Sequence, residues 1–239
     1  MFYLKRLSSI FATLLLMTVS GAVARASPTV GIRPNAESVR SPLNIAILIQ
    51  DDLISSVGNE LGVTRDFITS LPSGSRVMVG YITSGTLQVR QPFTTDLNMA
   101  AHSLRIPLGS TSASPYNPYV EVLEALRKFD ASWKGRNAVL LISDGLDVSR
   151  GFDETAAGDT VDIHHAIDEA NKRNVAIYSF FAPSVGLTSH SRLASFYGQS
   201  SLNRVSHDTG GMAFFQGTTG FVTFDSYFKR LRDELNRTS

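Results

Sequence analysis

The stretch LNIAILIQDDLISS, residues 43–56, decides how the rest of the chain is interpreted. It contains the apolar run 45–49, and a continuous apolar run rich in Ile is typical of a strand buried on both faces of a parallel sheet. This run is followed almost at once by Asp51, Asp52 and Ser55. Because ligands of open α/β sheets gather outside the carboxyl ends of the strands, these polar residues are the first candidates for a site.

Strand and helix patterns alternate along the rest of the chain. Further buried strands are predicted over 138–142 and 175–181, and a β-hairpin over 76–93 turns at Ser84-Gly85. Apolar residues at helical spacing fill the stretches between these strands. The alternation predicts an α/β fold, namely a doubly wound, mostly parallel sheet with one antiparallel edge strand and helices on both faces.

Capping residues mark where several helices begin and end. Asp96 precedes a short helix, and Asp159 or Thr160 precedes another. Towards the carboxyl end, the stretch 193–197 has helical character, and a helix around 202–205 is predicted to end at the glycine pair after Thr209.

The first 26 residues, 1–26, carry the three parts of a secretory signal peptide. Two basic residues come first, an apolar run follows over 10–19, and Ala24-Arg25-Ala26 is a typical cleavage site. We therefore expect a secreted or periplasmic protein; an uncleaved N-terminal anchor is the alternative. Residues 27–42, with three prolines, predict a linker or extended segment, and 43–236 a single domain.

Composition excludes several classes of function. The formal net charge is +1 and no basic stripe stands out, which argues against a nucleic-acid-binding protein. The chain has no cysteine, so disulfides, thiolate metal sites and cysteine nucleophiles are excluded. Beyond the signal peptide, no stretch predicts contact with a membrane.

Two predicted buried strands end in an acidic residue, and both ends lie at the same edge of the sheet. Asp51 follows the first strand, Asp144 follows the strand at 138–142, and the loop 109–114 supplies hydroxyls. Oxygen ligands without Cys or His fit a hard cation such as Mg²⁺. The alternative is that Asp51 caps the following helix and Asp144 holds a tight turn.

Five motifs taken in order resemble the von Willebrand factor type A (VWA) domains, more narrowly their exported bacterial, VWFA-related branch. They cover about 42–235 and read ILIQDDLISS, GSTSASP, AVLLISDG, VAIYSFF and DTGGMAFF. The resemblance implies the Rossmann-like VWA fold and a metal-ion-dependent adhesion site at the strand ends. Carried over residue by residue, the metal ligands fall on Asp51, Ser55, Thr111 and Asp144.

The carried-over ligand set departs from the family at one position. Leu53 stands where the family has a serine whose hydroxyl binds the metal, so Asp52 or a water would have to substitute for it. The assignment of Thr111 also stays open, because Ser110, Ser112 or Ser114 could take its role.

The resemblance implies a non-enzymatic, exported, protein-binding or adhesion-type domain. Mg²⁺ would be its cofactor, and its partner would be another protein that offers an acidic side chain. One alternative is a metal-independent structural or interaction domain with a dead metal site. A metal-assisted hydrolase that uses Asp51, Asp52 and Asp144 is a further alternative, although the chain has neither a Gly-x-Ser-x-Gly motif nor a P-loop.

Overall fold

The computed structural model describes residues 42–133, 135–151, 160–217 and 222–237. All of them belong to one compact unit, Val39–Ser239. The predicted signal peptide, 1–26, lies outside the described residues, as does the segment 27–42 except for Pro42. Among the described helices, none is long and apolar enough to cross a membrane.

One six-stranded sheet forms the centre of this unit, with the strand order β3-β2-β1-β4-β5-β6. Neighbouring strands are parallel except β2 and β3, which form the predicted antiparallel hairpin at one edge. The doubly wound α/β fold is therefore confirmed. The strands are β1 (Leu43–Gln50), β2 (Arg76–Thr83), β3 (Thr86–Thr94), β4 (Arg136–Ser143), β5 (Val175–Phe181) and β6 (Ala213–Phe214).

Strand β1 lies in the middle because every one of its residues is buried. It pairs in parallel with β2 on one side and with β4 on the other. Fully burying a Val, Leu or Ile side chain stabilises the fold by roughly 1.5–3 kcal/mol, so such a strand is most favourable between two partners. This position also sends the residues that follow Gln50 to the middle of one rim of the sheet.

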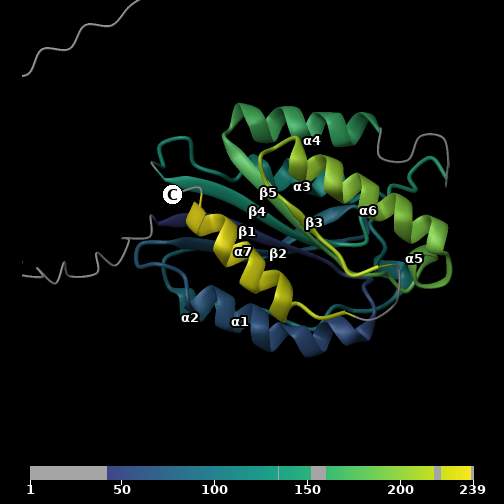
Figure 1. Cartoon of the computed structure of the whole chain (residues 1–239), viewed down its shortest axis with the longest axis horizontal. Coiled ribbons are helices and arrows are strands. Elements are labelled where there is room, and N and C mark those ends of the chain that lie inside the picture. Colours follow the sequence, from purple (N-terminus) through teal and green to yellow (C-terminus); the bar gives the residue numbers. More distant parts are fainter. Residues whose placement is uncertain (1–41, 134, 152–159, 218–221, 238–239) are drawn as a thin grey trace, which may run out of the picture. The chain divides into compact units, whose positions relative to one another are not determined.

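Helices cover both faces of the sheet (Figure 1). Successive residues of β1 alternate between two cores: Ile45, Ile47 and Ile49 belong to one, and Ala46 and Leu48 to the other. The first core is closed by α1 (Leu61–Thr69), α2 (Leu97–His102) and α7 (Asp225–Arg237), the second by α3 (Pro118–Leu126), α4 (Val161–Lys172) and α6 (Arg192–His207).

Short elements complete the chain. The 3-10 helix η1 (Ser55–Glu60) precedes α1, η2 (Thr111–Ala113) precedes α3, and α5 (Leu187–His190) follows β5.

The predicted local signals occupy the expected places. Ser84 and Gly85 both have positive φ, 46° and 75°, as a two-residue hairpin turn between twisted strands requires. The Asp96 carboxylate accepts a hydrogen bond from the Met99 N–H at 2.9 Å and so caps α2. Thr160, rather than Asp159, caps α4, by accepting from the Ile163 N–H.

The two helical segments predicted over 193–209 are one continuous helix, α6. Its middle contains Gly198, which weakens the helical signal in the sequence but allows a close approach to the chain after β4. A Cβ atom added at Gly198 would lie 1.9 Å from the Asp144 carbonyl oxygen. Helix α6 therefore packs directly against the backbone of Asp144 and supports it.

We expect Gly198→Ala to destabilise the protein by about 1–3 kcal/mol or more, because the added methyl group overlaps backbone that cannot move away. Gly62→Ala is the matched control, since Gly62 lies in α1 with no atom within 4 Å of an added Cβ. That substitution should stabilise the protein by up to about 1 kcal/mol. Urea unfolding of both variants measures the difference; equal effects would contradict the packing described here.

Candidate functional site

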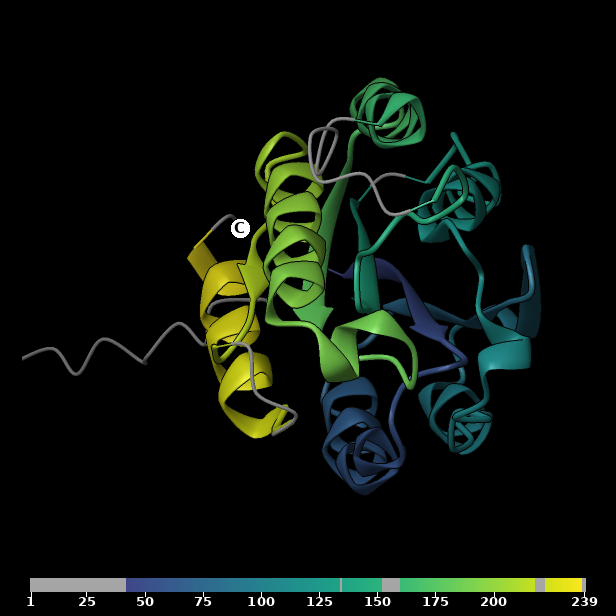
Figure 2. The ribbon, with the colours of Figure 1, turned by 90° about the vertical axis from the view of Figure 1, so that its right-hand side faces the viewer.

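The carboxyl ends of β1, β4 and β5 meet at one rim of the sheet. It is the end of the unit at which α5 lies in Figure 1, and Figure 2 looks onto it. Backbone hydrogen bonds tie its loops together: the Ile54 N–H donates to the Pro183 oxygen at 3.0 Å, and the Val185 N–H donates to the Asp52 oxygen at 2.8 Å. These hydrogen bonds connect the loops after β1 and β5, which carry polar groups at the strand ends.

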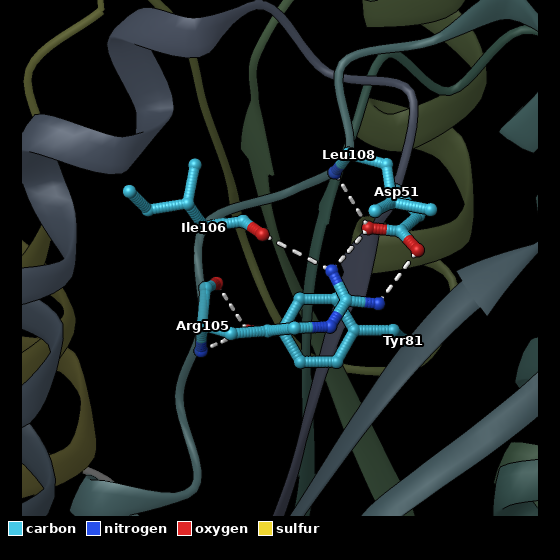
Figure 3. A network of polar contacts seen from close by, with 5 residues as sticks. All are labelled: Asp51, Tyr81, Arg105, Ile106 and Leu108. Carbon is cyan, nitrogen blue, oxygen red and sulfur yellow. Dashed lines mark hydrogen bonds and ion pairs between the residues drawn. The ribbon is translucent and has the colours of Figure 1, made fainter.

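Asp51 is fully buried and is paired with a guanidinium group. Both of its oxygens accept from Arg105, at 2.6 Å from Nη1 and 2.7 Å from Nη2 (Figure 3). The Leu108 N–H donates to the same carboxylate at 2.9 Å. A bidentate pair of this kind is among the stronger charge-assisted interactions in proteins. The carboxylate of Asp51 is therefore engaged from within the chain.

Tyr81 of β2 fixes the position of Arg105. The guanidinium carbon lies 4.0 Å from the centre of the Tyr81 ring, which is a cation–π contact. The Tyr81 hydroxyl accepts from the Arg105 N–H at 2.7 Å and donates to the Arg105 carbonyl at 2.6 Å. The hydrogen bond that Arg105 donates to Asp51 raises the pKa of Arg105, and burial raises the pKa of Tyr81. Arg105 therefore stays charged at every physiological pH.

Leu53, which replaces a metal-binding serine of the family, is a core residue here. It is completely buried, belongs to the same core as Ile49 and forms an isolated backbone bridge with Ser184. Its side chain thus contributes to packing at the position where the resemblance implies a ligand.

The structure brings two of the four predicted metal ligands to a common cavity. Asp144 and Thr111 line a common cavity, but neither Asp51 nor Ser55 does so. Ser55 is exposed on η1, and both oxygens of Asp51 are held by Arg105. The part of the chain that the structure describes contains no group of three or more acidic or histidine side chains that could hold a metal ion. As a set of Mg²⁺ ligands, Asp51, Ser55, Thr111 and Asp144 stay a prediction.

The cavity that contains Asp144, which we name the acid pocket, has a volume of about 220 Å³. Its lining is acidic, because it includes both Asp52 and Asp144. The remaining polar lining includes Gln50, Thr111, Ser114 and Ser184, and its apolar lining includes Tyr116, Leu146 and Leu187. Ser114, one of the serines that could take the role of Thr111, thus lines the same cavity as Thr111.

Hydrogen bonds hold the two carboxylates of the acid pocket in place. Gln50 donates to Asp52 Oδ1 at 2.7 Å, and Thr188 donates to Asp144 Oδ2 at 3.1 Å. The Leu146 N–H donates to Asp144 Oδ1 at 3.2 Å. Each carboxylate therefore has a fixed orientation that does not depend on any ligand.

Burial raises the pKa of both acids. The pKa of Asp52 rises to about 6, first because the group is buried and then because Asp144 lies nearby; the hydrogen bond from Gln50 opposes the shift. Burial likewise raises the pKa of Asp144, and its hydrogen bonds, that from Ser184 first, oppose the shift. Two carboxylates that repel each other in a buried site favour a positive charge between them.

Sequence reasoning did not identify Arg105 as a partner of Asp51. The two residues are 54 positions apart, and no motif links them. Asp51 and Asp52, although adjacent in the chain, have different surroundings: Asp51 is paired with Arg105, whereas Asp52 lines the acid pocket.

Comparison with known proteins supports the fold alone. The sequence matches no protein-family model and no curated protein. Among solved structures, the chain is similar to an aerotolerance-related membrane protein from Bacteroides fragilis NCTC 9343, with 13% identity, a TM-score of 0.53, and coverage of 82% of this chain and 98% of that one. It is also similar to BatB, a conserved hypothetical protein from Bacteroides thetaiotaomicron (15%, 0.53, 82% and 97%).

A third similar structure carries the family name. It is a von Willebrand factor type A protein from Catenulispora acidiphila, with 15% identity and a TM-score of 0.51, covering 82% of this chain and 42% of that one. Together these likenesses show a VWA-like fold, in agreement with the resemblance inferred from the sequence.

The raised pKa of Asp52 predicts a pH-dependent effect of Asp52→Asn. Since the pKa is higher in the folded protein (about 6) than in the unfolded chain, the protonated group is favoured by folding, and this stability is lost as pH rises through 6. Asp52→Asn should therefore unfold at higher urea than the wild type at pH 7.5, by about 1–3 kcal/mol. Below pH 4 the two proteins should converge. A variant less stable than the wild type at pH 7.5 would contradict the burial of an unpaired charge.

Proposed function

We propose that this VWA-like domain is a non-enzymatic binding module that engages another protein through the rim at the carboxyl ends of its strands, without a metal ion. The observation that carries this proposal is the bidentate pair between Arg105 and Asp51, the first ligand of the adhesion site that the resemblance implies. The chain thus supplies a positive charge of its own to the carboxylate that the resemblance names as a metal ligand.

The energetics favour the guanidinium over a metal at this position. A metal ion that bound Asp51 would have to displace Arg105 and leave that cation without its buried partner. Breaking a fully buried ion pair costs roughly 3–5 kcal/mol, and the cost is smaller here because the Arg105 side chain is 26% exposed. Arg105 would also lose its cation–π contact with the Tyr81 ring. We therefore expect millimolar Mg²⁺ to bind only weakly at Asp51.

The rim has the exposed apolar side chains that a protein-binding surface requires. Ile106 and Leu108 follow Arg105 in the loop after α2 and are 61% and 63% exposed. Tyr116 and Leu187, on the loops beside the acid pocket, are 62% and 47% exposed. Aromatic and aliphatic side chains presented around a polar site are typical of protein interfaces.

We propose that the protein is located outside the cytoplasm. The support for this location is the signal-peptide pattern in 1–26, which predicts a secreted or periplasmic protein. One of the similar structures is called a membrane protein, which is consistent with a role at the cell envelope.

Photo-crosslinking in the producing cells tests the binding surface. A photoreactive amino acid in place of Leu108 or Leu187 should give a discrete crosslinked protein, and the yield should be unchanged by EDTA. Lys172 is the control position, because its exposed side chain lies at the end of α4, on the opposite rim.

Three outcomes would contradict the proposal. Crosslinks from Lys172 that equal those from the rim would remove the surface assignment. Loss of the rim crosslinks in EDTA would show that a metal is required. Recovery of the mature protein in the cytoplasmic fraction of the same cells would contradict export.

A further inference from the structure

The acid pocket contains two carboxylates that lack a counter-charge. Asp52 is 2% exposed and Asp144 is 4% exposed, yet neither forms an ion pair in the described part of the chain. No Lys, Arg or His is among the residues that line the pocket. Buried charges in proteins are nearly always paired, so this arrangement is costly for the isolated domain.

The pocket has room for the missing cation. Its volume, about 220 Å³, is several times the roughly 30 Å³ that one water occupies in the liquid. Asp51, on the other side of β1, has its cation in Arg105. The rim thus has one acid that is paired within the chain and a pair of acids that is not.

We propose that the acid pocket accepts a lysine side chain of the partner protein, with its ammonium group bound by Asp52 and Asp144. This inference rests on the proposed binding function and names the chemistry of the partner. It reverses the polarity that the family resemblance implies, in which the partner supplies the acidic group.

Hydrogen bonding favours lysine over arginine. Both oxygens of Asp144 already accept hydrogen bonds, from Leu146 and Thr188 among others, and Asp52 accepts from Gln50 and Ser114. Single acceptor positions on separate groups therefore remain, rather than the free two-oxygen edge that a guanidinium fork requires. A compact ammonium with three donors fits such scattered acceptors, which include the hydroxyls of Ser114 and Thr111.

The apolar lining suits the aliphatic part of a lysine. Tyr116 and Leu187 line the pocket while exposing 62% and 47% of their surface, so they can contact the methylene groups that lead to the ammonium. Tyr116 has a φ of 58°, and its carbonyl accepts a hydrogen bond from the Val148 N–H at 2.6 Å. A divalent metal ion would make no use of these apolar surfaces.

Nuclear magnetic resonance titration tests the proposal. The probe is the tripeptide acetyl-Gly-Lys-Gly-amide, and the control is the same peptide with norleucine, which has a similar aliphatic chain but no charge. We expect saturable shifts of the amide signals of Asp52, Ser114, Tyr116 and Ser184 with the lysine peptide. The norleucine peptide should bind at least tenfold more weakly.

Two variants make the result specific to the pocket. Asp52→Asn should reduce the affinity for the lysine peptide at least tenfold while the protein remains folded, because this substitution removes an unfavourable buried charge. Glu124→Gln is the matched control, since Glu124 is a half-exposed acid of α3 that does not line the pocket. It should leave the affinity unchanged.

Other results would overturn the inference. The lysine assignment is wrong if the lysine and norleucine peptides bind equally well, or if the wild type and Asp52→Asn bind the lysine peptide equally well. It is also wrong if MgCl₂ shifts the same signals and displaces the peptide. Failure here with rim crosslinks intact would overturn only this inference. Peptide binding without any rim crosslink would instead overturn the proposed function.

Discussion

The ion pair between Asp51 and Arg105 is the interaction on which the architecture of the rim depends. Asp51 is carried to the middle of the rim by the most buried strand of the sheet, so its charge needs a partner there. Arg105 supplies this partner with two hydrogen bonds, and Tyr81 holds Arg105 by its ring and its hydroxyl. Strands β1 and β2 and the loop after α2 are thereby joined through one charge.

This pairing divides the rim into two parts with different chemistry. On the side of α1 and α2, negative charge is neutralised within the chain. On the other side, Asp52 and Asp144 line the acid pocket without a counter-charge. Hydrogen bonds from Gln50 and Thr188, and the close packing of α6 against Asp144, hold these two acids in place. These two buried acids lower the stability of the folded protein. Functional sites often retain groups that are unfavourable for the fold, so this cost is consistent with a binding role.

The sequence specified the fold more completely than the site. Strands β2 and β5 begin and end where the alternation and the apolar runs predicted, because those patterns are local consequences of burial. Helix α6 was expected as two segments, since the reason for Gly198 is a contact with Asp144 that only the folded chain contains. The pairing of Asp51 with Arg105 was inaccessible for the same reason: it depends on tertiary structure, and no local pattern encodes it.

A double-mutant cycle on Asp51 and Arg105 measures how strongly the two side chains stabilise each other in the folded protein. The free energies of unfolding of the wild type, Asp51→Asn, Arg105→Gln and the double variant would be compared in urea. We expect a coupling energy of about 2 kcal/mol or more, because loss of Arg105 leaves the fully buried Asp51 carboxylate unpaired. A coupling below about 0.5 kcal/mol, the level of an exposed surface pair, would contradict it.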